Sequence, residues 1–212
     1  MPVRLKNGTL HSVELETFYS PERASYPRMD ASTPLNPPVT ILRLDHRPSR
    51  DIRVSTHLLL AARALGARRA IYTGVHDPGL EESVRKVCVD WGGDFTVEHA
   101  SSWRRVVREW QGKVVHLTMY GLPIRDCLEQ IRGDPSEKLV VVGGSKVPGE
   151  VYGLADWNVA VTGQPHSEVS ALAVFLHELY EGRELLLASP GARLKVVPMA
   201  HGKRVEGAAS DL

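Results

Sequence analysis

The stretch VAVTGQPHSEVSALAVFLHEL, residues 159–179, joins a strand pattern to a helix pattern through a short polar bend. VAV is an apolar, mostly β-branched run, and TGQPHSE follows it directly. Ser167 can then cap a helix that carries Glu168 in its first turn. An apolar stripe at helical spacing continues the pattern through Val169, Leu172, Ala173, Leu176 and Leu179. The stretch predicts a strand, a bend and an amphipathic helix.

The same order of strand and helix recurs along the chain. Strand-like runs occupy residues 39–44, 69–74, 94–99, 113–118, 138–143 and 157–161, and a helical pattern follows each run. The helix is clear within residues 101–112, where Ser101 or Ser102 can cap a stripe of Trp103, Val106, Val107 and Trp110. Six repeats predict an α/β fold with a mainly parallel sheet. Continuous apolar runs such as LVVV predict strands that are covered on both faces.

Composition limits the class of protein. The chain has 212 residues, of which 42% are hydrophobic, and its formal net charge is +1, so overall charge does not indicate a polyanion partner. Two cysteines are too few for a disulfide framework, and there is neither an apolar signal segment nor a run of about 18 apolar residues. We expect a soluble, cytoplasmic protein. We divide it into a leader, residues 1–38, a main α/β domain, 39–182, and a terminal strand or hairpin with a tail, 183–212.

Several common catalytic motifs are absent from the sequence. No G-x-G-x-x-G follows a predicted strand, and neither G-x-x-x-x-G-K-[ST] nor G-x-S-x-G occurs. His177-Glu178 begins like a zinc-protease helix, but Glu181 stands where the second histidine is required. These absences argue against a dinucleotide-dependent dehydrogenase, a P-loop ATPase and a metal enzyme.

Four polar turns fall at the carboxyl ends of predicted strands, where open parallel sheets bind ligands. They are LDHRPSRDIR (44–53), HLTMYG (116–121), GGSKVP (143–148) and TGQPHSE (162–168). Glycines in the last three turns let the backbone approach a ligand closely. The alternative is that each glycine only makes a tight turn between a strand and a helix.

These turns carry a resemblance to a known family. HRPSRDIRVSTH followed by ALGA, then HLTMYG, VPGEVYGLADWNVAV and GQPHSEVSALAVFL, resemble the archaeal tRNA ribose 2'-O-methyltransferases that modify cytidine 56 in the T-loop, a branch of the SPOUT superfamily. The likeness spans about residues 39–205. It implies an α/β fold with a deep C-terminal trefoil knot that holds S-adenosylmethionine. It also implies a homodimer that acts on the D-loop and T-loop region of tRNA.

The resemblance implies a cofactor pocket made from the last three turns. Its residues are Leu117, Thr118, Gly121, Gly143, Gly144, Ser145, Lys146, Val147, Val161, Thr162, Gly163, Gln164, Pro165, His166, Ser167 and Glu168. Three places depart from the family's usual residues: Asp45 stands for glycine, Gly144-Ser145 for alanine and an acidic residue, and Thr162-Gly163 for Gly-Asn. Backbone contacts survive such changes, whereas side-chain contacts from positions 145 and 163 stay open.

The catalytic residues implied by the resemblance are Arg47, Arg50, Arg53 and His166. A guanidinium can bind a phosphate in a forked arrangement while it stabilises a developing alkoxide. The alternative for the arginines is a solvated loop paired with Asp45 and Asp51, and His166 could equally be structural. His57 could be a core histidine.

Other basic residues could form a tRNA-facing patch: Arg63, Arg68, Arg69, Arg104, Arg105, Arg108, Lys195, Lys203 and Arg204. Scattered surface charge is the alternative for each. Besides a methyltransferase, a non-catalytic RNA-binding protein on the same scaffold, or more distantly a regulatory module for another nucleotide, remains open.

Overall fold

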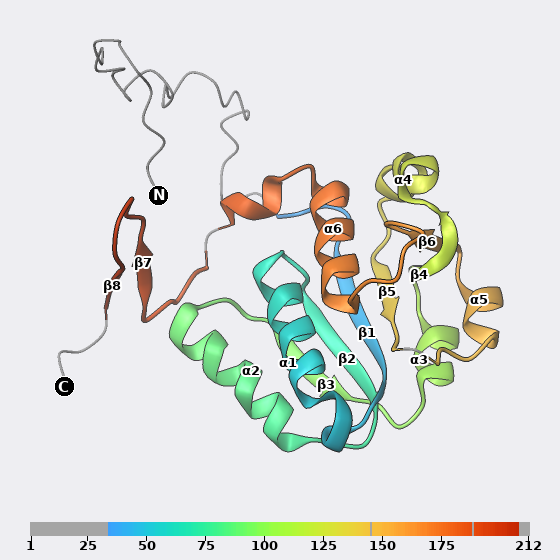
Figure 1. Cartoon of the computed structure of the whole chain (residues 1–212), viewed down its shortest axis with the longest axis horizontal. Helices are drawn as coiled ribbons and strands as arrows, with labels where there is room; N and C mark the ends of the chain where they lie inside the picture. The colour runs from blue at the N-terminus through green and yellow to red at the C-terminus, as the bar shows by residue number, and fades with distance from the viewer. Residues whose placement is uncertain (1–33, 145, 188, 208–212) are drawn as a thin grey trace, which may run out of the picture. The chain divides into compact units, whose positions relative to one another are not determined.

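The computed structural model of this chain describes residues 34–144, 146–187 and 189–207. Six strands form one sheet, and a helix follows each strand (Figure 1). The strands are β1 (Val39–His46), β2 (Arg69–Gly74), β3 (Thr96–His99), β4 (Lys113–Pro123), β5 (Lys138–Val142) and β6 (Trp157–Ala160). The helices are α1 (Pro48–Ala64), α2 (Pro78–Trp91), α3 (Trp103–Glu109), α4 (Ile124–Gly133), α5 (Glu150–Leu154) and α6 (Glu168–Tyr180). The predicted alternation is confirmed.

All pairings in this sheet are parallel, in the order β3-β2-β1-β5-β4-β6. The chain runs outward from β1 through β2 to β3, and then returns to the other side of β1 for the last three strands. The strand order therefore reverses between β1 and β5. A crevice opens at such a reversal, beyond the carboxyl ends of the strands, because the connections leave in opposite directions.

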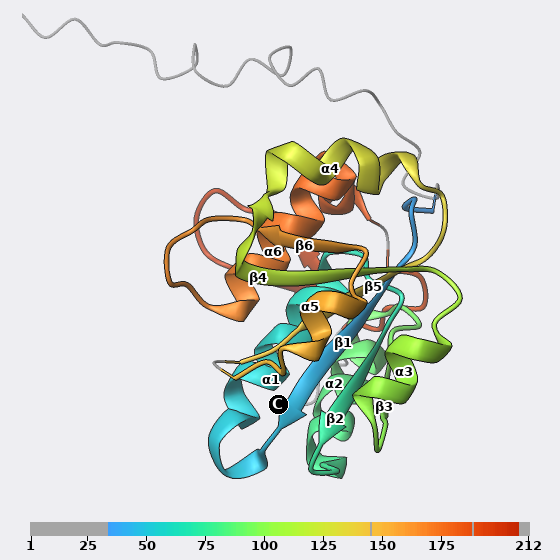
Figure 2. The same cartoon turned by 90° about the vertical axis from the view of Figure 1, so that its right-hand side faces the viewer.

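Helices cover both faces of the sheet, as the apolar runs predict (Figure 2). Side chains of α1, α2, α4 and α6 pack on one face, in the larger hydrophobic core. Val107 of α3 and Val151 of α5 pack on the other face, against Leu139 and Val141 of β5. Alternate residues of β5 point to opposite cores, which explains why the run LVVV is buried throughout.

Local capping sets the helix starts that the sequence indicates. The Ser102 hydroxyl accepts a hydrogen bond from the Arg105 amide, and the Ser167 hydroxyl accepts one from the Val169 amide. Each cap satisfies an amide that has no partner within its own helix. The predictions for α3 and α6 are thus confirmed, with Ser102 rather than Ser101 as the cap.

β4 is longer than its apolar run predicts, because it is interrupted rather than ended at Thr118. Val159 of β6 is opposite both Leu117 and Leu122, so residues 118–121 bulge out of the ladder between them. A Cβ atom on Gly121 would overlap the backbone of Asn158. Close packing of two strands therefore requires glycine at this position, a reason that differs both from ligand contact and from a tight turn between a strand and a helix.

The two ends of the described chain contact the main α/β domain. Leu35 packs against its larger core, and the Tyr180 hydroxyl donates a hydrogen bond to the Pro37 carbonyl, so the last residues of the proposed leader lie on the domain. Residues 1–33 of that leader lie outside the described residues. A 3-10 helix, η2 (Arg183–Leu186), leads to an antiparallel hairpin of β7 (Lys195–Val197) and β8 (Arg204–Glu206).

Candidate active site

A cleft of about 550 Å³ opens at the carboxyl ends of β4 and β5, beside the reversal of strand order. Its wall comes from segments that are far apart in the sequence: 116–120 at the interruption of β4, 142–144 and 146–147 at the end of β5 and just after it, and 165–168 before α6. Arg50 of α1 and Tyr152 of α5 complete it with Ala171. Three of the four polar turns therefore converge on one cavity, and the fourth contributes Arg50.

Most of the cofactor residues that the resemblance implies lie in this wall. They are Leu117, Thr118, Gly143, Gly144, Lys146, Val147, Pro165, His166, Ser167 and Glu168. Among the described residues, another group implied for the same pocket lies outside the wall: Gly121, Val161, Thr162, Gly163 and Gln164. Ser145 lies outside the described residues. The bend before α6 thus faces the cleft through its second half only.

The glycines of these turns have different local surroundings. A Cβ atom on Gly143 would overlap the side chain of Val147, so packing within the loop requires this glycine. On Gly144 a Cβ would lie 3.5 Å from Oε1 of Glu168, which is ordinary contact, and on Gly163 it would meet no atom within 4 Å. Packing does not demand glycine at position 144, yet its missing side chain keeps the cleft open there.

Arg43 is a charged residue beneath this cleft that the sequence analysis did not single out. It lies on β1 with 2% of its surface exposed, and its Nη2 is 3.9 Å from Oε1 of Glu168. Its Nε and Nη1 are buried and have no hydrogen-bond partner among the described residues. Burial lowers the pKa of Arg43, although the charge of Glu168 acts in the opposite direction. An arginine inside the apolar run VTILRL was the available signal.

A polar network lines the β4 side of the cleft. Nδ1 of His116 is 2.9 Å from Oδ1 of Asn158 on the neighbouring strand β6. Nδ2 of Asn158 donates to the carbonyl of Tyr152, and the Tyr152 hydroxyl is 3.0 Å from Oγ1 of Thr118. Of these residues, sequence reasoning selected only Thr118, because the others come from a strand interior and a separate helix.

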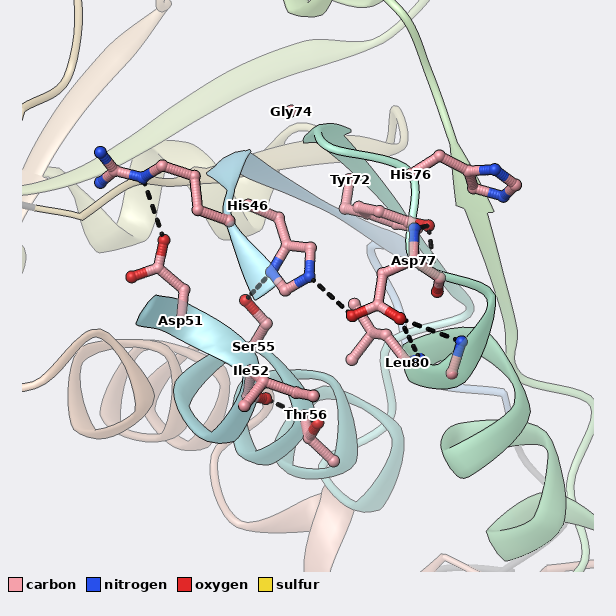
Figure 3. A network of polar contacts seen from close by, with 12 residues as sticks. His46, Asp51, Ile52, Ser55, Thr56, Tyr72, Gly74, His76, Asp77 and Leu80 are labelled. Atoms are coloured by element: carbon pink, nitrogen blue, oxygen red, sulfur yellow. Dashed lines mark hydrogen bonds and ion pairs between the residues drawn. The ribbon is translucent and has the colours of Figure 1, made fainter. Parts of the chain in front are cut away.

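A buried histidine anchors the arginine segment, residues 47–53 (Figure 3). Nδ1 of His46 is 2.8 Å from Oγ of Ser55, and its Nε2 is 3.1 Å from Oδ2 of Asp77. Burial acts to raise the pKa of Asp77, but hydrogen bonds from His46 and from backbone amides lower it overall. Since His46 immediately precedes the segment and Ser55 follows it, the network fixes both of its ends.

The three arginines of this segment differ in position. Arg47 precedes α1, with its Nε 3.5 Å from Asp51 and 3.8 Å from Asp45. Arg50 also pairs with Asp51, at 3.5 Å, and it lines the cleft. Arg53 is exposed on α1, outside the cleft wall. Arg47 thus pairs with both aspartates and Arg50 with Asp51, and of these two arginines Arg50 also faces the cavity.

The two other histidines of interest are on the surface. His57 is exposed on α1, so the alternative of a core histidine is wrong: residue 57 falls on the solvent side of the helix. His166 is exposed and lines the cleft, and its Nδ1 is 2.6 Å from the Gln164 carbonyl. That contact holds the ring against its own turn.

The described residues, 34–144, 146–187 and 189–207, include neither a metal-binding group nor a membrane-spanning helix. No group of three or more histidine, cysteine, aspartate or glutamate side chains there could hold a metal ion. None of its helices has both the length and the apolar character needed to span a membrane.

Comparison with known proteins places this arrangement in a family. Residues 91–206 match the family model described as tRNA ribose 2'-O-methyltransferase, aTrm56. A tRNA (cytidine(56)-2'-O)-methyltransferase of Methanothermobacter thermautotrophicus is 53% identical over 168 residues, covering 78% of this chain and 94% of the relative. A curated enzyme of the same name from Methanopyrus kandleri is also 53% identical, covering 81% of this chain and 98% of the relative.

Solved structures agree with the fold. The A. aeolicus TrmH/SpoU tRNA modifying enzyme is 14% identical and covers 71% of this chain and 78% of its own, with a TM-score of 0.53. This likeness supports a SPOUT-type α/β fold. Taken with the family model and the curated relatives, it shows that the chain belongs to the tRNA ribose 2'-O-methyltransferase family aTrm56, whose reaction is methylation of the ribose 2'-hydroxyl of cytidine 56 in tRNA.

Proposed function

We propose that the enzyme takes its methyl group from S-adenosylmethionine held in the cleft between the loop after β5 and the bend before α6. When bound, this cofactor supplies a methyl group on a positively charged sulfur. The observation that carries the proposal is the convergence of three polar turns on one cavity at the reversal of strand order. The missing side chain at Gly144 and the nearby carboxylate of Glu168 suit a polar, cationic ligand.

The protein's own residues have two tasks in this reaction. A neutral ribose hydroxyl is a poor nucleophile, so it has to be aligned with the methyl group and helped to lose its proton. We assign alignment to the arginine segment, and within it to Arg50, because Arg50 lines the cleft. Its planar guanidinium can hold a phosphate of the RNA and stabilise the developing alkoxide. Arg47 and Arg53 flank it as further phosphate contacts, and His166 lies at the same wall.

A matched pair of glycine variants tests where the cofactor binds. Gly144→Val adds bulk to the cleft wall at a position where the new Cβ meets only ordinary contacts, whereas Gly163→Val adds the same bulk outside the wall, where the new Cβ meets no atom within 4 Å. Calorimetric titration with S-adenosylmethionine is expected to show binding lost in Gly144→Val and retained in Gly163→Val, with both melting temperatures near that of the unaltered protein. Unchanged affinity in Gly144→Val would reject the cleft as the site.

We further propose that the enzyme is a homodimer whose active site combines two chains. Large apolar side chains on the described surface support an interface: Tyr120 is 78% exposed and Leu122 is 61% exposed, both at the end of β4 beside the cleft. Two copies of one patch would pair through a twofold axis. Mixing inactive Arg53→Ala, in which the altered arginine lies outside its own chain's cleft wall, with inactive Gly144→Val should restore part of the activity. Sedimentation of an active monomer would contradict the dimer.

The proposed substrate surface is the D-loop and T-loop region of tRNA. Several residues of the expected basic patch form local contacts: Arg104 and Arg108 both pair with Glu150, and Arg105 pairs with Glu109. Arg204 likewise pairs with Glu206. We base tRNA binding on the arginine segment, which adjoins the cleft, and on the hairpin lysines Lys195 and Lys203. Opening the loop contact around cytidine 56 would cost on the order of a few kcal/mol, which phosphate contacts would offset. We expect the enzyme to methylate tRNA in the cytoplasm.

We also propose the deep trefoil knot that the resemblance implies. The strand order supports it, because the chain leaves β5, reaches the outer strand β6 and then returns through α6 to pack on α1. A crystal structure traced from residue 113 to residue 182 would test the knot. A return of the chain outside the loop formed by residues 113–148 would contradict it.

A further inference from the structure

The wall of the cleft contains a buried hydrogen-bond acceptor without a partner. His116 is fully buried on β4, and its Nε2 has no hydrogen-bond partner among the described residues. Buried polar atoms are ordinarily paired, because an unpaired one forfeits its hydration without compensation. Since His116 lines the cleft, the missing partner can come from a ligand.

The network around His116 determines which ring nitrogen carries the proton. Nδ2 of Asn158 donates to the backbone carbonyl of Tyr152, which can only accept, so the amide oxygen of Asn158 faces His116. At 2.9 Å from that oxygen, Nδ1 of His116 must be the donor. In the neutral ring, Nε2 is then unprotonated and can only accept.

Burial keeps the His116 ring neutral, and two contacts fix its orientation. Burial lowers the pKa of His116, which outweighs the opposing hydrogen bond to Asn158, so the ring is uncharged at neutral pH. The Tyr152 ring lies edge-on to it, with centroids 4.7 Å apart and an interplanar angle of 89°. The Tyr152 hydroxyl is in turn held at 3.0 Å from Oγ1 of Thr118. The acceptor is therefore preorganised.

We propose that Nε2 of His116 accepts a hydrogen bond from a neutral donor of the cofactor's nucleoside, either its exocyclic amino group or a ribose hydroxyl. This inference rests on the proposed cofactor cleft. A cationic ammonium is a poorer match, because a fully buried neutral ring would strip its hydration without providing an opposite charge. The role of His116 is to select and orient the nucleoside, and it makes no contact with the methyl group.

Two substitutions separate the nitrogens of this ring. His116→Asn retains a side-chain amide near Nδ1 and removes Nε2, whereas His116→Gln places an amide oxygen near Nε2 and gives up Nδ1. Titration with S-adenosylhomocysteine, which keeps the nucleoside and cannot transfer a methyl group, is expected to show about tenfold weaker binding for His116→Asn. His116→Gln is expected to recover part of that loss. Affinity of His116→Asn equal to that of the unaltered protein would overturn the inference.

Nucleoside analogues identify the donor. The inosine analogue lacks the amino group, and the 2'-deoxy and 3'-deoxy analogues each lack one hydroxyl. The analogue without the true donor is expected to bind the unaltered protein about tenfold more weakly, and to show no such penalty in His116→Asn. Equal penalties in both proteins for all three analogues would overturn the inference and leave water as the partner.

Nitrogen NMR of the unaltered protein tests the same hydrogen bond without any substitution, so the test does not depend on a variant that folds. With labelled histidine, Nε2 of His116 should show the shift of an unprotonated nitrogen and move upfield on saturation with S-adenosylhomocysteine. No movement at saturation would overturn the inference. If Gly144→Val also retained full affinity, the cleft assignment would fail instead, so the two failures are distinguishable.

Discussion

Replacing Arg43 by methionine should stabilise the fold while impairing the enzyme. The guanidinium is 2% exposed, its Nε and Nη1 have no hydrogen-bond partner among the described residues, and Glu168 is 3.9 Å away, beyond hydrogen-bond range. Burial lowers the pKa of Arg43 below that of an exposed arginine. A base whose pKa is lower in the folded state costs stability at every pH at which it is charged, so the cost is present throughout the neutral range.

The size of the stabilisation expected for Arg43→Met depends on how completely the fold compensates the buried guanidinium charge. Replacing a whole buried ion pair by apolar residues of similar volume is often neutral or stabilising by about 1–4 kcal/mol, whereas removing one partner is costly when the other charge stays buried. Glu168 is partly exposed, so water can solvate its carboxylate once the guanidinium is gone. We take the lower end, about 1 kcal/mol, which corresponds to about 2–4 °C in the melting temperature of a domain of this size.

Urea unfolding and calorimetry of Arg43→Met test this expectation, with Arg85→Met as a control. Arg85 is exposed and pairs with Glu82 on α2, so its replacement should change stability by no more than about 0.5 kcal/mol. Arg43→Met should also bind S-adenosylmethionine more weakly, because the Glu168 carboxylate loses the guanidinium that holds it in position in the cleft. A stability loss above about 1 kcal/mol in Arg43→Met would refute the reasoning, since it would mean that the guanidinium is fully compensated within the fold.

Three further outcomes are expected. Asp45 has a φ of 54°, a left-handed conformation that costs a non-glycine residue about 1 kcal/mol. Asp45→Gly should therefore raise the urea midpoint of unfolding. Asp45→Ala keeps the conformational cost and should give no such gain. His46→Leu leaves Ser55 and Asp77 without their buried partner and should lower the free energy of unfolding by about 2–3 kcal/mol. The same change at exposed His57 should lower it little. Equal losses for the two variants would contradict the anchoring role of His46. Methylation of tRNA should fall steeply as salt is raised, because phosphate contacts release counterions, and a salt-independent rate would exclude them.

The sequence supports the fold prediction because local patterns report burial directly. The six apolar runs become six parallel strands, and Ser102 and Ser167 cap the helices that follow two of them. The end of β4 could not be predicted in this way. Its ladder resumes at Leu122 only because β6 is its neighbour, and strand neighbours are not encoded in the local run.

The candidate site was predictable where glycine-rich turns mark it, and less so elsewhere. The turns containing Gly144 and Glu168 do line the cleft, but Gly121 serves strand packing instead. Arg43 and His116 were missed because each is a polar residue inside an apolar strand. Periodicity shows that such a side chain is buried, whereas its partners depend on which strands and helices meet around it.

The most direct test of the central claim is the position of the transferred methyl group. The purified protein would be incubated with an unmodified tRNA transcript and labelled S-adenosylmethionine, alongside Gly144→Val and Gly163→Val, and the product would be mapped by nuclease digestion and mass spectrometry. The expected product is 2'-O-methylcytidine at position 56, formed by the unaltered protein and Gly163→Val but not by Gly144→Val. A methyl group on a base, on a ribose outside the T-loop, or formed equally by Gly144→Val would contradict the account.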